Sequence, residues 1–323
     1  MKTFSATFLT GEKAGQEPAD ARELAAALAE KQLLWIHLDA GAAETRPWLE
    51  QNLKALDPTT IDALLQNETR PRAETLNDGA LINLRGVNTN PGADPEDMVS
   101  IRIWADECRI VTLTLRPLAT ITALQEEVRA GNGAGTSGDF VCRLSELLCT
   151  RIEGFLRDLE ERVDFLEADV LGEPDQALRQ GITDARQDVI LFRRFVAPQR
   201  DALAYLLHFR SPAFMSSKEL RRLSEVHDRV VRVVEELDEF RDRLVVIRDE
   251  LANVMSERVN RNLYLLSVIS LIFLPLGFLT GLLGINVGGI PGTSEPVSFW
   301  VVCAICIAVV ALLLLVLRRK NWI

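Results

Sequence analysis

The fold is decided by a C-terminal stretch without any charged side chain, residues 262–294, which reads NLYLLSVISLIFLPLGFLTGLLGINVGGIPGTS. After the single Glu295, charge is absent again until Arg318. A membrane helix needs about 20 apolar residues to cross about 30 Å of hydrocarbon. We therefore predict two transmembrane helices, at residues 263–284 and 297–317, joined by a short loop at residues 285–296.

The charges that flank the two spans predict their orientation. Basic side chains lie before the first span and in the tail after the second, at Arg258, Arg261, Arg318, Arg319 and Lys320, whereas the connecting loop carries only Glu295. Cytosolic flanks of membrane helices are enriched in Lys and Arg. We therefore expect a multi-pass protein with an external loop, a basic cytosolic tail at residues 318–323 and both termini in the cytosol. The start of the chain lacks the pattern of a cleaved signal peptide.

One face of the first span carries small and polar residues at steps of three or four. We call this face the first-span stripe; its members are Asn260, Leu263, Ser267, Ser270, Leu274, Gly277, Gly281 and Gly284. Small and hydroxyl side chains on one face suit either close helix packing or the wall of a pore, and the sequence alone favours neither. A simple membrane anchor needs no such stripe.

The first 262 residues form an acidic body, with 45 acidic and 33 basic side chains and a net charge of −12. This composition excludes a disordered chain and argues against nucleic acid as a partner. The sequence has no Walker motif, no Gly-x-Ser-x-Gly and no plausible nucleophile–base pair, so we predict no enzymatic activity and no cofactor. Cys303 and Cys306, inside the second apolar run, are expected to be small buried thiols.

The body divides into an α/β domain and a helical part. Residues 1–138 alternate strand and helix patterns, which predicts an α/β domain. The expected strands lie at residues 4–9, 33–38, 80–87, 98–104 and 109–115, and the expected helices at 20–31, 47–56 and 59–66. The glycine-rich residues 131–138 lack Gly-Lys-Ser/Thr, so we interpret them as a linker and not as a phosphate-binding loop.

Long helices follow the linker. Residues 139–217 are predicted to form a helical hairpin, and residues 218–262 a long stalk helix. Ten apolar residues of the stalk alternate steps of three and four: Leu223, Val226, Val230, Val233, Leu237, Phe240, Leu244, Ile247, Leu251 and Val254. Such a seam packs along other helices. Because no Pro or Gly intervenes from residue 218 to 273, we expect one helix of about 100 Å to continue into the first span.

The charged and histidine side chains of the helical part have two interpretations. Acidic residues crowd the segments 153–173 and 235–250, where they form either solvated helix faces with intrahelical ion pairs or, around a symmetry axis, an attractive mouth for divalent cations. The three histidines, His37, His208 and His227, form no His-x-x-x-His pair, so no dense zinc site is encoded locally. His227 is expected to be a solvent-facing polar residue, with metal binding as the alternative.

Three features together resemble the CorA-type divalent metal transporters: Gly284-Ile285-Asn286 directly after the first span, the two C-terminal spans, and the closing residues 318–323, RRKNWI. The hallmark of that family is Gly-Met-Asn, and this chain departs from it with Ile285. The following GGIPG at residues 288–292 is similar to the ZntB branch, which is associated with zinc. The segments TRPRAE at residues 69–74 and APQRDAL at residues 197–203 resemble the same branch.

The resemblance implies an α+β fold: a cytosolic α/β/α domain, long stalk helices and a C-terminal two-helix transmembrane hairpin, assembled into a funnel-shaped homopentamer. The five first spans would line an axial pore, so the first-span stripe would become its wall. By the same resemblance, Asn286 lies at the outer entrance, where amide oxygens replace part of the water shell of a divalent ion. Gly284 would allow the tight turn before it.

The function implied is uptake of zinc across the bacterial inner membrane, with zinc as the transported ion and proton coupling as a further hypothesis. Leu263 and Leu274 are expected to narrow the pore as apolar rings. The expected metal contacts are Asn286 through hydration water, Glu295 at the outer mouth and His227 in the cytosolic funnel. A magnesium or cobalt channel is the alternative within this class, and a membrane-anchored coiled-coil scaffold is a more distant one.

Overall fold

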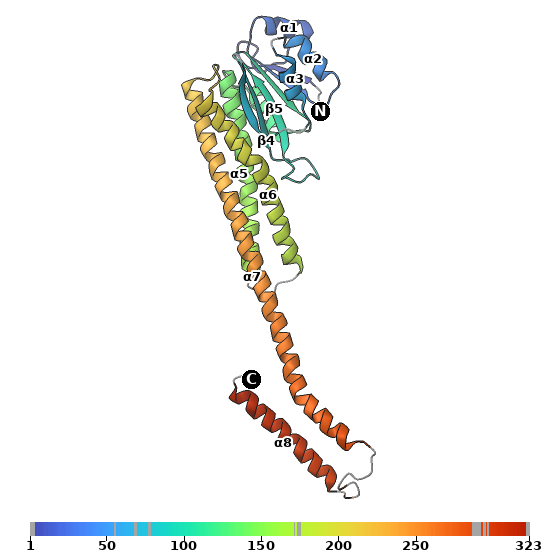
Figure 1. Ribbon diagram of the computed structural model, residues 1–323. Coiled ribbons are helices and arrows are strands. Elements are labelled where there is room, and N and C mark those ends of the chain that lie inside the picture. The colour runs from blue at the N-terminus through green and yellow to red at the C-terminus, as the bar shows by residue number, and fades with distance from the viewer. Residues whose placement is uncertain are drawn as a thin grey trace. The chain divides into compact units, whose positions relative to one another are not determined.

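The computed structural model describes residues 4–54, 56–67, 70–76, 79–170, 172, 176–285, 292, 295 and 297–320. The chain divides into two compact units, Met1–Asp249 and Glu250–Ile323. The first unit, which holds most of the acidic body, combines a mixed β-sheet with long helices, and the second holds two apolar helices at the C-terminal end (Figure 1). The architecture is therefore the expected α+β arrangement with a C-terminal helical pair.

The body contains a six-stranded sheet in the order β1-β2-β6-β5-β4-β3. The strands span Phe4–Phe8, Leu34–Asp39, Arg72–Leu76, Gly79–Gly86, Val99–Ala105 and Arg109–Thr114 for β1 to β6. Among the strands that the structure describes, only β2 and β6 run parallel, with Ile36 opposite Val111, and the other pairs are antiparallel. The five expected strands are present. The additional edge strand β3 was not predicted.

Short helices cover one face of this sheet (Figure 1). They are α1 (Ala21–Ala29), α2 (Thr45–Asn52) and α3 (Pro58–Leu65). The first is capped by Asp20, whose carboxylate accepts from the backbone N–H groups of Arg22 and Glu23, and α3 begins with a proline after the cap Asp57. Leucine and isoleucine side chains of these helices and of β2 form a buried core. A further helix, α4 (Ala119–Arg129), was not predicted from the sequence.

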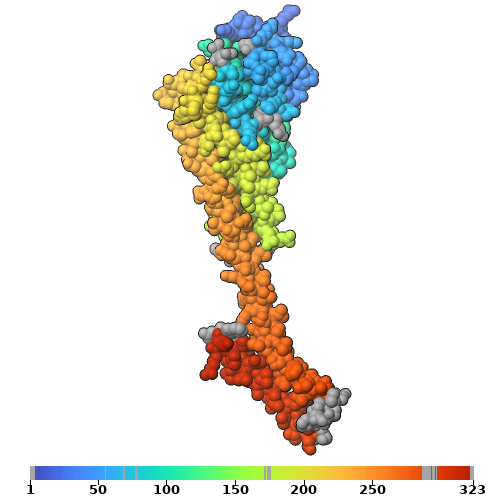
Figure 2. Space-filling model, viewed as in Figure 1, coloured from blue at the N-terminus to red at the C-terminus, as the bar shows by residue number. Residues whose placement is uncertain are grey.

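Three long helices pack along one another in the body: α5 (Ser137–Val170), α6 (Gln176–Ala204) and α7 (Ser217–Leu283). Phe155 of α5 stacks on Phe192 of α6 with 3.9 Å between ring centroids. Figure 2 shows the surfaces of α6 (yellow-green) and α7 (orange) meeting along the body, where Arg193 of α6 bonds to Asp238 of α7. The predicted α7 seam is buried from Leu223 to Leu251, and only its last member, Val254, is partly exposed.

Ion pairs join α5 to α7 at a constant sequence offset. Three arginines of α7 each bond to a glutamate of α5 that lies 76 residues earlier: Arg222 to Glu146, Arg229 to Glu153 and Arg243 to Glu167. We call these pairs the arginine ladder. The offset shows that α5 and α7 run parallel and in one heptad register. The ladder therefore fixes how far α7 is displaced along α5.

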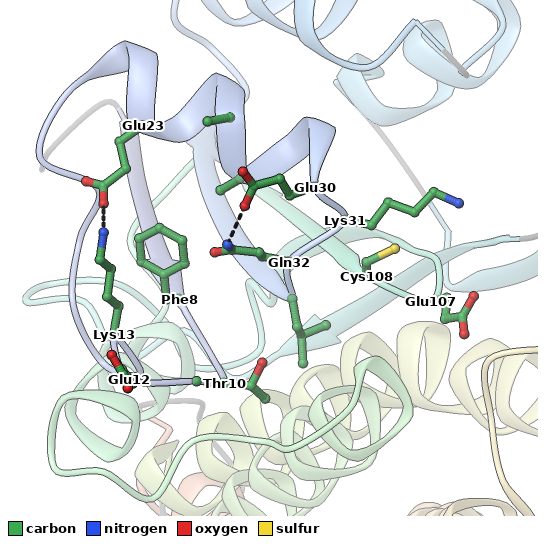
Figure 3. A pocket seen from close by; sticks show the side chains of 14 residues that line it. Phe8, Thr10, Glu12, Lys13, Glu23, Glu30, Lys31, Gln32, Glu107 and Cys108 are labelled. Carbon is green, nitrogen blue, oxygen red and sulfur yellow. Dashed lines mark hydrogen bonds and ion pairs between the residues drawn. The ribbon is translucent and has the colours of Figure 1, made fainter.

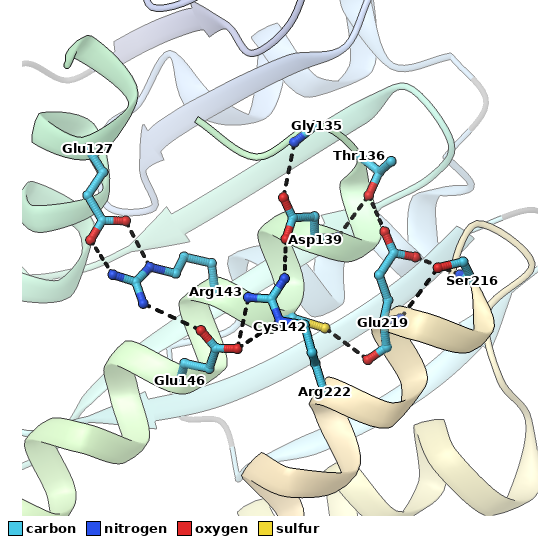
Figure 4. A network of polar contacts seen from close by, with 10 residues as sticks. All are labelled: Glu127, Gly135, Thr136, Asp139, Cys142, Arg143, Glu146, Ser216, Glu219 and Arg222. Atoms are coloured by element: carbon cyan, nitrogen blue, oxygen red, sulfur yellow. Dashed lines mark hydrogen bonds and ion pairs between the residues drawn. The ribbon is translucent and has the colours of Figure 1, made fainter. Parts of the chain in front are cut away.

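The first pair of the arginine ladder, Arg222 with Glu146, belongs to a denser polar network where α4, α5 and α7 meet (Figure 4). Arg143 of α5 bonds bidentately to Glu127 of α4, at 2.6 and 2.9 Å. Glu219, in the first turn of α7, accepts from the hydroxyl of Thr136 and from the backbone N–H of Ser216. These hydrogen bonds lower the pKa of Glu219, although its partial burial alone would raise the pKa. The start of α7 is thus held by charge-assisted hydrogen bonds.

The second unit contains the two helices that are long and apolar enough to cross a membrane. The first is the C-terminal part of α7, which is continuous from the heptad seam to Leu283, and the second is α8 (Ser298–Arg319). Their most apolar windows have mean hydropathies of 2.3 and 3.2, and only 0% and 6% of these windows are buried. Apolar surface on this scale requires a lipid environment or other helices.

Candidate functional site

The first-span stripe lies on an exposed face of α7. Each of its members is exposed, and the two large ones, Leu263 and Leu274, have 55% and 74% of their surface accessible. Five residues of the same segment are partly covered instead: Val268, Ile272, Pro275, Leu276 and Leu279. At 100° per residue, the centre of the covered face lies about 160° around the helix from the centre of the stripe. The stripe is therefore the face turned away from the covered side.

The covered positions of α8 also lie on one side of that helix. They are Ser298, Val302, Cys303, Cys306, Val309, Val310, Leu313 and the buried Leu317. Both cysteines are free and partly covered, in keeping with small packed thiols. Because each apolar helix has a single covered side, the rest of its surface is available to lipid or to further helices.

Hydroxyl groups on the apolar part of α7 bond to their own helix. The Ser267 hydroxyl donates to the Leu263 carbonyl at 2.8 Å, and the Thr280 hydroxyl donates to the Leu276 carbonyl at 2.9 Å. A serine hydroxyl that donates its one hydrogen in this way keeps its oxygen lone pairs as acceptors. Along an exposed face, such oxygens can accept hydrogen bonds from the water shell of a cation.

The Gly284-Ile285-Asn286 motif follows the end of α7. The Gly284 N–H donates to the Thr280 carbonyl at 2.9 Å, and a Cβ at this position would lie 2.9 Å from that same oxygen. Glycine is thus required by close backbone approach. Ile285 is exposed, whereas Asn286 lies outside the described residues, so its predicted entrance role stays a prediction. Glu295, which lies between the two apolar helices in the sequence, is exposed. Its backbone carbonyl accepts a hydrogen bond from the Ser298 N–H at 3.1 Å.

Acidic side chains of the segments 153–173 and 235–250 form ion pairs both between helices and within α7. Arg243 of α7 bonds to Asp164 of α5 as well as to its ladder partner, whereas Asp242 and Asp249 each bond to the arginine that precedes them in α7. The predicted intrahelical pairing is therefore accompanied by ion pairs between helices. Among the residues that the structure describes, no three His, Cys, Asp or Glu side chains are grouped to hold a metal ion.

His227 lies in a more specific setting than the sequence indicated. Its side chain is only 16% exposed, so it is not the solvent-facing residue that we expected. Its Nδ1 lies 3.2 Å from Asp228 Oδ1, and its ring centroid lies 6.2 Å from that of His208. His208 was not singled out as a candidate, because the two histidines belong to different elements and only the tertiary fold brings them together. The third histidine, His37, is buried beside Thr112, and burial lowers its pKa to about 4.

An open pocket of the body lies elsewhere, beside α1 (Figure 3). It has a volume of about 880 Å³, and its lining carries both signs of charge, including Lys13 paired with Glu23. Cys108 also lines it, and partial burial raises the pKa of this thiol. A raised pKa makes a thiol a poorer nucleophile at neutral pH. The pocket thus provides no activated cysteine.

Comparisons with known proteins place these features in one family. A family described as "CorA-like Mg2+ transporter protein" matches residues 30–319. The chain is 38% identical over 298 residues to the divalent cation transporter CmaX of Pseudomonas aeruginosa, covering 91% of this chain and 88% of the relative. It is 33% identical over 292 residues to the zinc transport protein ZntB of Yersinia pseudotuberculosis serotype O:1b, covering 90% and 88%.

Solved structures agree with the fold. The structure of the full-length CmaX protein matches with a TM-score of 0.77 and 38% identity, over 90% of this chain and 89% of that one. The CorA magnesium transporter from Methanocaldococcus jannaschii matches with a TM-score of 0.77 over 90% and 92%, at 18% identity, and this likeness concerns the fold alone.

Proposed function

The chain belongs to the family of CorA-like Mg2+ transporter proteins and is a divalent cation transporter, and we propose that the ion it carries is zinc. Proteins of this family are ion transporters and not enzymes. We place the protein in the bacterial inner membrane as a homopentamer with both termini in the cytosol. Zinc would be taken up through an axial pore with Asn286 at its outer entrance.

The main support for an axial pore is the direction in which the first-span stripe faces. It is exposed on the side of α7 opposite the covered face, so symmetry copies of α7 can bring their stripes together around an axis. Hydroxyl oxygens and small residues then face the ion path, and no charged residue lies between residues 262 and 285. A neutral wall of this kind suits a hydrated divalent ion, which a fixed carboxylate would hold too tightly.

Leu263 and Leu274 would narrow this path. Both are large and exposed on the stripe, so five copies of each would form two apolar rings. Apolar constrictions impede ions by dewetting, and they open when the helices move apart. We assign the gate of the transporter to these two rings.

Asn286 is proposed as the outer selectivity ring. A ring of amide oxygens can hydrogen-bond to the water shell of an incoming ion without a full negative charge. Gly284, which permits the close backbone approach at the end of α7, supports a tight turn directly before Asn286. Glu295 belongs to the external loop that joins the two apolar helices, and it adds a negative charge there.

Zinc is favoured over magnesium by the relatives named zinc transport protein and by the zinc-associated features of the sequence. We assign any proton coupling to groups other than the first span, which carries no carboxylate, histidine or lysine between residues 262 and 285. We infer that the zinc hydration shell carries the proton chemistry, because zinc acidifies bound water. Glu295 and His227 are the side-chain alternatives.

Flux into reconstituted vesicles tests this proposal. Zinc and magnesium uptake should be compared with and without a pH gradient, using wild type and Asn286→Ala. We expect zinc uptake that Asn286→Ala abolishes while the oligomer stays intact by size-exclusion chromatography. Magnesium uptake without zinc uptake would identify the magnesium-channel alternative, and undiminished zinc uptake by the assembled variant would refute the role of Asn286.

A matched pair of variants tests the pore wall separately. Ser270→Phe places a large ring on the first-span stripe, whereas Ile269→Phe places the same ring on a neighbouring exposed position about 100° around the helix. We expect Ser270→Phe to reduce uptake at least tenfold and Ile269→Phe to leave it within about twofold of wild type. Equal effects of the two variants would contradict the assigned pore face.

A further inference from the structure

We propose that His208 and His227 bind one transition-metal cation of zinc type on the body, at a site that shares no residue with the first-span stripe. The two side chains come from different elements. His208 belongs to the π-helical turn η1 (Tyr205–Phe209) that follows α6, and His227 lies in the third turn of α7. They lie 19 residues apart in the sequence, and the fold places their ring centroids 6.2 Å apart.

The distance between the rings suits a shared metal. Two imidazoles on one tetrahedral zinc ion, with Zn–N distances of about 2.0–2.1 Å, have ring centroids roughly 5 Å apart. The observed separation exceeds this by about 1 Å, which a small rotation of His208 can remove, because this side chain is exposed. The rings are perpendicular, at 89°, so they are not fixed by face-to-face stacking.

Asp228 prepares His227 for metal binding. When Nδ1 of His227 carries the hydrogen, it donates to Asp228 Oδ1 at 3.2 Å, and Nε2 keeps its lone pair for a metal. This carboxylate–histidine arrangement is the usual support of a metal-binding imidazole, since it fixes the tautomer and raises the basicity of the ring. His227 is largely buried, which holds its orientation further.

The backbone around His208 is also held in place. The Arg210 N–H donates to the Tyr205 carbonyl at 3.2 Å and closes the π-helical turn, and the Thr75 hydroxyl of β3 donates to the Arg210 carbonyl at 2.8 Å. Single π-helical turns occur frequently at functional sites. A metal held by both histidines would therefore connect this anchored turn directly to α7.

The chemistry of the site predicts its selectivity. Imidazole suits zinc, cobalt, nickel and copper, whereas magnesium prefers oxygen ligands and retains its water. Two protein ligands leave the remaining coordination positions to water or to a neighbouring copy of the chain. The site should accordingly take zinc and cobalt and exclude magnesium, whichever ion the pore conducts, so this inference does not depend on the proposed function.

Cobalt titration of the purified full-length chain, free of any histidine tag, tests the site. Imidazole-bound cobalt has a visible absorption spectrum, and zinc affinity follows from displacement of the cobalt. We expect one site per chain in wild type and at least tenfold weaker binding in His208→Ala and His227→Ala. Asp228→Asn should weaken binding about tenfold or more. Excess magnesium should not displace the cobalt.

A ligand exchange controls for misfolding of the alanine variants. His208→Cys keeps a metal ligand at an exposed position, so it should restore zinc binding and add a sulfur-to-cobalt charge-transfer band that wild type lacks. Unchanged cobalt affinity in both alanine variants, or a cysteine variant without the new band, would overturn the proposal. Because binding is read directly, a chain that fails in zinc flux can still confirm this site, and a chain that lacks the site can still transport.

Discussion

Replacing Glu236 by arginine should stabilise the body, because it would complete the arginine ladder between α5 and α7. The offset of 76 residues that pairs the three ladder arginines with glutamates places Glu236 opposite Glu160. This position is thus occupied by two carboxylates where the register calls for an ion pair. Desolvation and the nearby charge of Glu160 both raise the pKa of Glu236.

The size of the effect follows from the exposure of the pair. Both side chains belong to exposed residues, for which an ion pair contributes about 0.2–1 kcal/mol and a like-charge pair costs a similar amount. Exchanging repulsion for attraction should therefore raise the free energy of unfolding by about 1 kcal/mol. For a unit of this size, that corresponds to a rise of roughly 2–4 °C in the unfolding midpoint.

Thermal unfolding of the full chain in detergent, followed by circular dichroism at 222 nm, measures this change. Glu236→Gln should give about half the gain, since it removes only the repulsion. Glu235→Arg is the matched control, because it adds the same charge one residue away from the ladder position. The advantage of Glu236→Arg should shrink in 1 M salt, where exposed charges are screened. An equal rise in the control, or no rise in Glu236→Arg at low salt, would refute the register argument.

Because the pKa of Glu236 is raised in the folded chain, the contribution of this residue to stability depends on pH. A carboxyl group whose pKa is higher in the folded chain binds its proton more tightly there, so its contribution to stability is lost as the pH rises through the folded pKa. Wild type should consequently lose more stability than Glu236→Gln when the pH is raised from below the ordinary pKa of glutamate to neutrality.

Three further changes have defined outcomes. Gly86→Ala should lower stability by about 1–3 kcal/mol in urea unfolding, because a Cβ there would lie 2.7 Å from Leu148 and 2.8 Å from Leu118. Burial lowers the pKa of His37 to about 4. As the pH falls from 6.5 to 4, the free energy of unfolding of wild type should therefore fall by about 1.4 kcal/mol more per pH unit than that of His37→Gln. Parallel stability curves of the two proteins would contradict this. Glu295→Gln should leave the pH dependence of zinc uptake into vesicles unchanged. If the variant takes up zinc without this pH dependence, the Glu295 carboxylate is the proton carrier.

The long helices could be predicted because their signal is local and repeated. The heptad seam of α7 continues for ten apolar positions, and burial from Leu223 to Leu251 confirms it. The strand β3 lacks such a signal, since its sequence RAETL is polar and only one neighbouring strand pairs with it. Helix α4, which was not predicted, does carry a helical pattern in its sequence, because its buried residues Ile121, Leu124 and Val128 follow helical spacing.

The candidate sites also differ in how much of them could be predicted from the sequence. The first-span stripe follows from helical periodicity alone, so its common face could be predicted, whereas its place in a pore depends on other copies of the chain. The closeness of His208 to His227 depends on how the turn after α6 packs near α7, and no spacing in the sequence encodes it. The interhelical ion pairs likewise need the offset between α5 and α7, which becomes visible only in the folded body.

The constant offset between α5 and α7 also limits how the length of this protein can change in evolution. One residue inserted into either helix turns all later side chains by about 100° and carries them out of line with their partners. Seven residues added to both helices at equivalent positions would preserve the alignment and lengthen the body by about 10 Å. Insertions between α6 and its neighbours leave the alignment untouched. Tolerated length variation should therefore collect in those connections, and within α5 and α7 it should occur in paired steps of seven residues.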